Sequence, residues 1–241
     1  MFSDVLLTVD YDRTLTAPDS TIPQRNLEAI RYFIANGGAF TVNTGRSIPL
    51  ARGIMKNVPL SAPLLLYNGS AAYNVEKQEL YSMRPIELDP QETIARALEL
   101  FPDLVVEVQA MDAHSAFRKN ENWEAFGEHN HCPWKYITPD RSPTPFLKFS
   151  LYLTASTPTV NAMFSASPQD SARMDEAEAV LHREFGDALE VFRAAPKIID
   201  IHARGVSKIC SARDLQKSMG RKILVCAGDA LNDLSMLEGA D

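Results

Sequence analysis

The sequence has few cysteines, no long hydrophobic run and no surplus of positive charge. Its three cysteines, Cys132, Cys210 and Cys226, are odd in number and widely spaced, which argues against a disulfide framework and favours reduced thiols. No stretch approaches the roughly 18 consecutive apolar residues of a membrane-spanning helix. The chain enters its first apolar segment almost directly, without the basic segment and apolar region of a secretory signal. We therefore expect a cytoplasmic protein with no membrane partner.

Acidic residues outnumber basic ones, and the net charge is −7 at pH 7. Nucleic-acid-binding proteins usually carry clustered lysine and arginine, so this balance argues against a nucleic-acid partner. The 241 residues, 45% of them hydrophobic, suffice for one large domain or two of ordinary size. An anionic substrate has to be attracted by local cations, because the protein as a whole would repel it.

The most informative segment lies near the start of the chain. An apolar run over residues 5–9 predicts a buried parallel strand, and it ends in Asp10 and Asp12, followed by Thr14. Reactive groups of open α/β sheets gather at the carboxyl ends of such strands. Two carboxylates there would repel each other, and a cation between them removes that cost, so the pair predicts a Mg²⁺ site.

Two further predicted strands also end in polar residues. An apolar run over residues 39–43 leads to Thr44 and Gly45, which supply a hydroxyl and a backbone that a ligand can approach closely. A run over residues 222–227 leads to more polar groups: Gly228, Asp229, Asn232 and Asp233. Carboxylates thus gather at a second strand end.

A helix is predicted to begin at Lys208. Apolar residues recur behind it at a spacing of three to four residues as far as Met219, and Gly220 is a suitable stop. At a helix N-terminus both the lysine charge and the free backbone N–H groups favour an anion.

Taken in order, these residues resemble the motifs of the haloacid dehalogenase (HAD) superfamily. The motifs are Asp10-x-Asp12-x-Thr14, Thr44, Lys208 and Gly228-Asp229-x-x-Asn232-Asp233. The variant resembled is the Cof-type phosphatase branch, with an α/β cap of the C2 type inserted between the second and third motifs. The resemblance spans residues 2–241 and implies an α/β fold, with a Rossmann-like parallel sheet in the core and an inserted α/β cap domain.

The resemblance also implies a role for each motif residue. Asp10 would be the nucleophile that carries an aspartyl-phosphate, and Asp12 would be the general acid and then the general base. The phosphate would be bound by Thr44, Gly45, Lys208 and Asn232. Mg²⁺ would be held by the carboxylates of Asp10 and Asp229 and the backbone carbonyl of Asp12, with Asp233 supporting the metal site.

Two features depart from the family pattern. Arg13 stands where family members mostly have glycine, and this long cation either adds affinity for phosphate or crowds the loop. Family members also continue beyond the equivalent of Asp241 with a further strand and helix. Either the sequence is shortened or the core lacks one edge of its sheet.

The periodicity predicts a catalytic core over residues 1–81 and 204–241 and a cap over residues 82–203. In the core, a helix is expected over residues 24–36. In the cap we expect a helix starting at Pro90 and capped by Asp89, a half-buried strand over residues 147–153, and a Ser/Thr/Pro-rich surface loop over residues 154–171. The polar and aromatic residues of segment 112–136, among them His114 and Trp123, either face a ligand or form a solvated, irregular cap surface, and we favour the second interpretation.

We therefore predict a Mg²⁺-dependent phosphatase that hydrolyses a small phosphorylated metabolite, such as a sugar phosphate, because a cap admits only compact substrates. Three alternatives stay open. A phosphomutase of the phosphomannomutase-like type shares the motifs, a phosphoacceptor receiver domain shares the acidic pocket but is shorter and uncapped, and Arg13 suggests a catalytically impaired phosphometabolite-binding protein. The substrate, and the choice between monomer and homodimer, are left open by the sequence.

Overall fold

The computed structural model describes residues 1–154 and 165–241, and it divides into two compact units. Unit 1 comprises residues 1–46, 51–84 and 206–241, and unit 2 comprises residues 47–50 and 85–205. Much of the predicted loop over residues 154–171 lies outside the described residues. Its last residues were predicted wrongly, because a helix begins at Pro168. No helix in the described part of the chain is long and apolar enough to cross a membrane.

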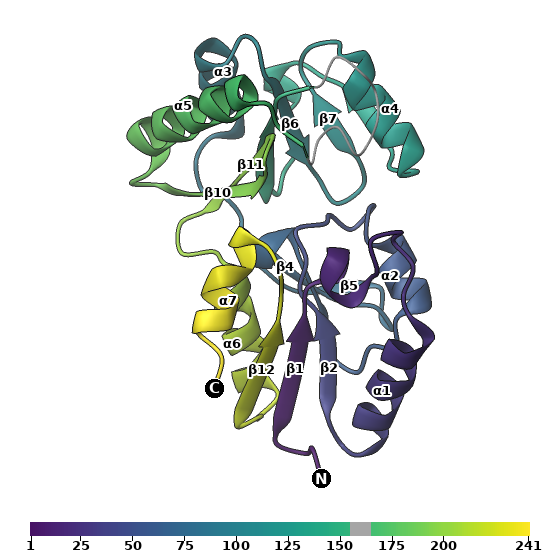
Figure 1. Cartoon of the computed structure of the whole chain (residues 1–241). Coiled ribbons are helices and arrows are strands. Elements are labelled where there is room, and N and C mark those ends of the chain that lie inside the picture. The colour runs from purple at the N-terminus through teal and green to yellow at the C-terminus, as the bar shows by residue number, and fades with distance from the viewer. Residues whose placement is uncertain (155–164) are drawn as a thin grey trace. The chain divides into compact units, whose positions relative to one another are not determined.

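Unit 1 is built on a parallel sheet (Figure 1). In sheet order its strands are β12 (Ile223–Ala227), β1 (Val5–Val9) and β2 (Ala39–Val42). Val9 pairs with both Ala227 and Val42, so the three strands end at the same edge. A second, antiparallel group of strands follows along the chain: β3 (Leu64–Leu66), β4 (Ala71–Asn74) and β5 (Glu79–Met83).

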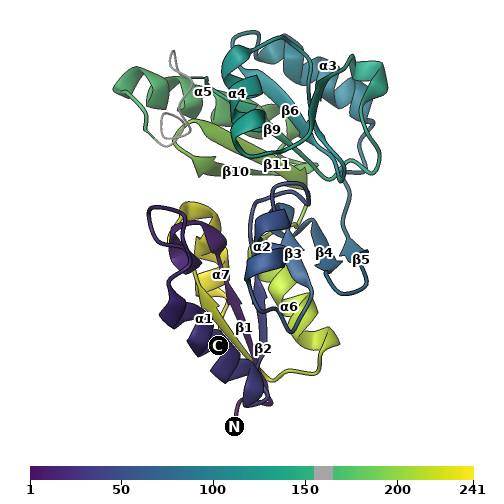
Figure 2. The same cartoon turned by 90° about the vertical axis from the view of Figure 1, so that its right-hand side faces the viewer.

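Helices lie on both faces of this sheet, and Figure 2 shows α1 and α6 on opposite sides of β1 and β2. The α-helices of unit 1 are α1 (Gln24–Ala35), α2 (Arg52–Asn57), α6 (Lys208–Ser218) and α7 (Leu234–Glu238). The helix predicted over residues 24–36 is therefore confirmed, as is the predicted helix start at Lys208. Ser207 caps α6 by accepting a hydrogen bond from the backbone of Cys210. This covered parallel sheet confirms the predicted α/β class.

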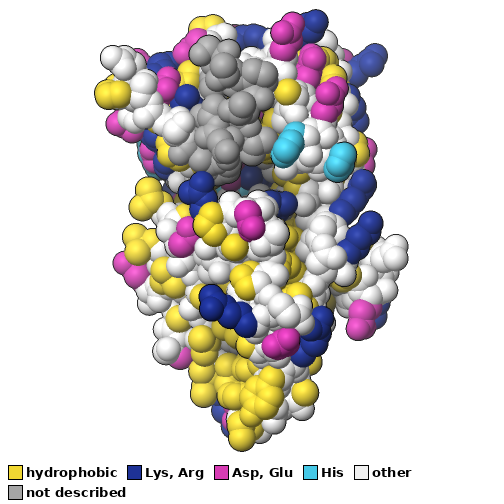
Figure 3. Space-filling view, turned by 45° about the vertical axis from the view of Figure 1, so that its right-hand side comes forward, with side chains coloured by type: hydrophobic (Ala, Val, Ile, Leu, Met, Phe, Trp, Pro, Cys, Tyr) yellow, Lys and Arg dark blue, Asp and Glu magenta, His cyan; other side chains and the backbone are white. Residues whose placement is uncertain are grey.

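Within the described residues, β12 forms one edge of the sheet. Asp241 covers part of that edge, because its backbone N–H donates to the carbonyl of Leu224 (3.0 Å). Ile223 and Val225 on the same strand are 44% and 41% exposed. The face shown in Figure 3 also carries a gathering of hydrophobic side chains over unit 1. Unit 1 thus leaves apolar surface uncovered.

Unit 2 contains a mixed six-stranded sheet with two long helices on one face. In sheet order its strands are β10 (Leu189–Ala195), β11 (Ile198–Ala203), β9 (Lys148–Tyr152), β6 (Val105–Gln109), β7 (His114–Ala116) and β8 (Trp134–Tyr136). The α-helices in the described residues of this unit are α3 (Pro90–Leu100), α4 (Glu121–His129) and α5 (Pro168–Phe185). The apolar face of the sheet packs against α3 and α5 (Figure 2). Asp89 caps α3 as predicted, by accepting from the backbone of Glu92 (2.9 Å).

The other face of this sheet is polar, yet it is buried. The strand predicted over residues 147–153 is confirmed as β9, but its predicted half-burial is wrong, because all five residues of β9 are buried. Lys148 Nζ lies 2.7 Å from Asp200, and the hydroxyl of Ser150 donates to the same carboxylate (2.7 Å). Neighbouring strands thus satisfy the polar groups that the alternating pattern assigned to solvent.

His114 and Trp123 were also predicted wrongly as solvated surface. Both are buried, and both donate hydrogen bonds to Glu107, at 2.7 Å and 2.9 Å. Glu107 in turn faces Ser150 across the β6–β9 pair. These two side chains are therefore parts of a buried network and not of an irregular surface.

Candidate active site

Asp10 and Asp12 follow directly from β1, but their carboxylates have different surroundings. The backbone N–H of Asp10 continues the sheet by donating to Ala227 (2.9 Å), and the chain then turns through η1 (Tyr11–Leu15), in which Asp12 and Arg13 have non-helical backbone angles. The side chain of Asp10 is only 9% exposed, whereas that of Asp12 is 49% exposed. Within η1, Arg13 has a φ of 65°, a left-handed conformation that glycine adopts without strain.

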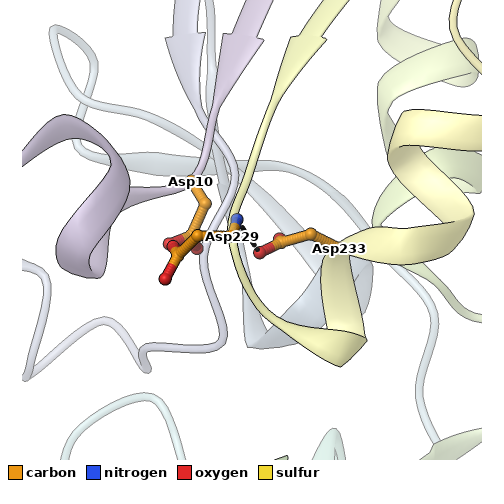
Figure 4. A group of neighbouring side chains, drawn as sticks. All are labelled: Asp10, Asp229 and Asp233. Carbon is orange, nitrogen blue, oxygen red and sulfur yellow. Dashed lines mark hydrogen bonds between the residues drawn. The ribbon is translucent and has the colours of Figure 1, made fainter.

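Three carboxylates from two segments of the chain meet at the carboxyl edge of the sheet (Figure 4). Asp10, Asp229 and Asp233 each place one oxygen within 4.8 Å of the others. Asp229 follows β12, and Asp233 ends the short helix η5 (Leu231–Asp233). One oxygen of Asp233 accepts the backbone N–H groups of Asp229 (3.1 Å) and Ala230 (3.0 Å), which fixes the turn after β12.

Lys208 joins this cluster from the first turn of α6. Its ammonium lies 2.6 Å from Asp10 Oδ1 and 2.6 Å from Asp233 Oδ1, and its side chain is fully buried. A buried ammonium is costly without partners, and here two carboxylates supply them. The structure therefore brings together Asp10, Lys208 and the acidic residues after β12, as the sequence predicted.

The electrostatics of Asp10 fit a divalent cation. Burial raises the pKa of Asp10, and the neighbouring carboxylate of Asp233 adds to this rise. The ammonium of Lys208 opposes it, and the pKa of Asp10 reaches about 6. A cation beside these oxygens would favour the ionised carboxylates. Mg²⁺ prefers carboxylate and carbonyl oxygens, and this is the chemistry of the donor set found here.

The residues predicted to bind phosphate lie around the same edge of unit 1. Thr44 is buried two residues after the end of β2, and its hydroxyl accepts the backbone N–H of Arg46 (3.2 Å). A Cβ at Gly45 would lie 2.8 Å from the side-chain oxygen of Asn68, so position 45 has little room for a side chain. The amide of Asn232 donates to that same oxygen of Asn68 (3.2 Å). Asn68 therefore contacts both of these predicted residues.

The site residues predicted from the sequence did not include Arg46. Arg46 binds Asp12 through two parallel contacts, Nε to Oδ2 at 2.9 Å and Nη2 to Oδ1 at 2.7 Å. Its guanidinium also lies over the ring of Tyr11, 4.9 Å from the ring centre. The sequence signal for Arg46 was its position directly after Thr44 and Gly45. A guanidinium at this position can bind a carboxylate through two parallel contacts.

Comparison with known proteins identifies the family of this chain. A family model described as haloacid dehalogenase-like hydrolase matches residues 7–241. The chain belongs to this family. The match, together with relatives that are named as phosphatases, confirms the predicted family and the predicted enzyme class, a phosphoric monoester hydrolase.

Two curated relatives of this HAD-like hydrolase are bacterial phosphatases. One is 5-amino-6-(5-phospho-D-ribitylamino)uracil phosphatase YcsE of Bacillus subtilis, 21% identical over 238 residues that cover 98% of this chain and 80% of the relative. The other is an HMP-PP phosphatase of Yersinia pestis, 24% identical over 252 aligned positions that cover 96% of this chain and 80% of the relative.

Solved structures with the same fold have similarly low sequence identity to this chain. A haloacid dehalogenase-like hydrolase from Bacteroides thetaiotaomicron has a TM-score of 0.78 and 18% identity, covering 100% of this chain and 86% of that one. A HAD subclass IIB sugar phosphatase has a TM-score of 0.77 and 20% identity, covering 98% of this chain and 84% of that one. These likenesses support the fold of the HAD-like hydrolase described here.

Proposed function

We propose that this HAD-like hydrolase is a Mg²⁺-dependent phosphatase that removes phosphate from a small phosphorylated metabolite through an aspartyl-phosphate on Asp10. The observation that carries the proposal is the position of Asp10 at the end of a parallel strand, in contact with Lys208 and beside two further carboxylates. Relatives named as a uracil-derivative phosphatase and an HMP-PP phosphatase, and a fold neighbour named as a sugar phosphatase, support a small phosphorylated substrate.

Asp10 is assigned the nucleophilic step. One of its oxygens, Oδ1, is bound by Lys208, and the other attacks the phosphorus while the bond to the leaving oxygen breaks. The ammonium of Lys208 reduces the repulsion between the carboxylate and the phosphate as they approach. Thr44, Gly45 and Asn232 are assigned to hold the phosphoryl oxygens.

Asp12 is assigned both proton transfers. It gives a proton to the leaving oxygen in the first step and takes a proton from the attacking water in the second. Its exposed carboxylate can exchange protons with solvent between the steps. Arg46 fixes the direction of the Asp12 carboxylate through its two parallel contacts.

Mg²⁺ would be held by the carboxylates of Asp10 and Asp229 and the backbone carbonyl of Asp12, with Asp233 supporting the site. When bound, the ion would neutralise charge on the transferring phosphoryl group.

The test is phosphate release from a panel of small phosphomonoesters, with Mg²⁺ and with EDTA, for the wild type, Asp10→Asn and Asp4→Asn. Asp4 lies at the opposite end of β1 with an exposed carboxylate paired to Lys222 (3.1 Å), so Asp4→Asn is a matched control. We expect release that requires Mg²⁺, a loss of roughly a thousandfold or more in Asp10→Asn, and wild-type rates in Asp4→Asn.

Each other outcome has a defined meaning. Folded wild type that releases no phosphate from any substrate contradicts the proposal and favours a phosphomutase or a binding protein. Isomerised sugar phosphates among the products would identify the mutase. Activity that survives Asp10→Asn would exclude the covalent mechanism on this residue.

A further inference from the structure

Asn43 occupies the position between β2 and Thr44, and its side chain contacts the helix that carries Lys208. Its Nδ2 group donates to the backbone carbonyl of Lys208 (2.9 Å) and lies 3.6 Å from the sulfur of Met236 in α7. Its backbone is held on both sides, by a hydrogen bond to Val9 (2.9 Å) and a bridge to Leu65. Asn43 therefore connects the end of the sheet to the first turn of α6.

The carbonyl oxygen of this carboxamide has no hydrogen-bond partner. Asn43 is fully buried, and its Oδ1 accepts no hydrogen bond, which is an unfavourable arrangement for a buried carbonyl oxygen. Both neighbours of Nδ2 are acceptors, so the orientation of the amide is determined by its surroundings. An apolar side chain of similar size would remove this unpaired oxygen. Stability alone therefore does not favour asparagine at this position.

The carbonyl of Lys208 does not depend on Asn43 to be satisfied. The hydroxyl of Ser211 also donates to it (3.0 Å). The contact with Asn43 therefore restrains the direction of α6. It is not needed to give the buried carbonyl of Lys208 a hydrogen-bond donor. Gly69 supplies a second restraint, because a Cβ there would collide with the carbonyl of Ser207.

We propose that Asn43 is a positioning residue that sets Lys208 relative to Thr44, two groups assigned to the phosphate. Its backbone leads directly into Thr44 and its side chain holds the first residue of α6, so one residue fixes the distance between them. This inference rests on the proposed function, which assigns both groups to the phosphate. Small displacements of such groups lower rates strongly, because catalysis of phosphoryl transfer depends on positioning.

The test compares Asn43→Leu with Thr8→Val. Thr8 also carries a buried oxygen without a partner, and it lies on β1 with no assigned role at the site. Both variants remove an unpaired buried oxygen, but only Asn43→Leu removes the contact to Lys208. We expect kcat/KM to fall about tenfold in Asn43→Leu and inorganic phosphate to bind several-fold more weakly by calorimetry in the presence of Mg²⁺. The melting temperature should stay the same or rise in both variants, and Thr8→Val should keep wild-type activity.

Wild-type kcat/KM and phosphate affinity in Asn43→Leu would overturn the inference. A loss of activity that follows a loss of melting temperature would show a structural role and would also overturn it. If the Asn43→Leu variant does not fold, Asn43→Ala takes its place in the same measurements, because alanine is too small to overpack the site. A wild type that neither binds phosphate nor hydrolyses phosphomonoesters contradicts the proposed function itself, and this outcome is distinct from the others.

Discussion

Replacing Glu107 with glutamine should strongly destabilise unit 2. Glu107 Oε1 lies 2.7 Å from His114 Nδ1, and both side chains are almost completely buried. Glu107 also accepts hydrogen bonds from Trp123 (2.9 Å) and Tyr152 (2.6 Å). Glutamine keeps the shape of this side chain but removes its charge. Removing one partner of a buried ion pair typically costs about 3–5 kcal/mol, because the other charge loses its compensation.

The same pair makes the stability of unit 2 depend on pH. Burial lowers the pKa of His114, but the carboxylate of Glu107 outweighs this effect and raises the pKa from 6.5 to about 9. The folded protein holds this proton more tightly than the unfolded chain does. The stabilisation is therefore fully present below pH 6.5 and is lost as the pH rises to about 9, a change of about 3 kcal/mol.

At acid pH the other partner responds. Burial raises the pKa of Glu107, but His114 outweighs this effect and lowers the pKa from 4.5 to about 2. The contribution of ionised Glu107 to the stability of unit 2 is present above pH 4.5 and is lost as the pH falls towards about 2. One attraction underlies both shifts, so the two contributions are not added.

Urea unfolding followed by tryptophan fluorescence measures this directly, because both tryptophans, Trp123 and Trp134, lie in unit 2. The wild type should lose stability between about pH 6.5 and pH 9, whereas Glu107→Gln should be less stable and nearly flat over that range. Glu190→Gln is the control, since Glu190 is partly exposed and lies 3.6 Å from the exposed Arg204. Two results would refute a role of the Glu107–His114 pair in this pH dependence. One is a wild type whose free energy of unfolding is constant between these pH values, and the other is a Glu107→Gln variant whose free energy of unfolding falls in parallel with that of the wild type.

Three further predictions concern unit 1. In EDTA, Asp10→Asn should be more stable than the wild type by about 3 kcal/mol at neutral pH, because the pKa of Asp10 rises from 3.8 to about 6; the gain should vanish below about pH 4 in urea unfolding. Arg13→Gly should add about 1 kcal/mol of stability by relieving the positive φ; a raised KM would show that Arg13 contacts phosphate, and a raised kcat that it crowds the loop. Arg46→Ala should lower kcat about tenfold or more by releasing Asp12, and an unchanged kcat would remove Arg46 from the site.

The carboxylate cluster could be predicted from the sequence because it depends on short-range patterns. Asp10 and Asp229 each follow a short apolar run, and parallel strands present their ends at one edge of a sheet. The pairing of Val9 with Ala227 is therefore enough to bring the two carboxylates together. Lys208 could be placed for a similar reason, because Ser207 and the apolar spacing behind it define where α6 begins.

The buried polar face of unit 2 could not be predicted in this way. Lys148, Ser150 and Tyr152 alternate with apolar residues, and this pattern is the same whether water or protein covers the polar side. What decides burial is the register with distant strands, which places Ser150 opposite Glu107 on one side and Asp200 on the other. No local feature of the sequence contains that register.

The charges of the proposed site determine the order in which it fills. Fully ionised Asp10, Asp229 and Asp233 would leave two negative charges uncompensated by Lys208, and the Asp12–Arg46 pair adds none. A phosphate dianion would be repelled by this site, and the net charge of −7 offers no attraction from a distance. A divalent cation cancels the local excess. We therefore predict that Mg²⁺ binds before the phosphate, and that the affinity for inorganic phosphate rises with Mg²⁺ concentration until the cation site is saturated.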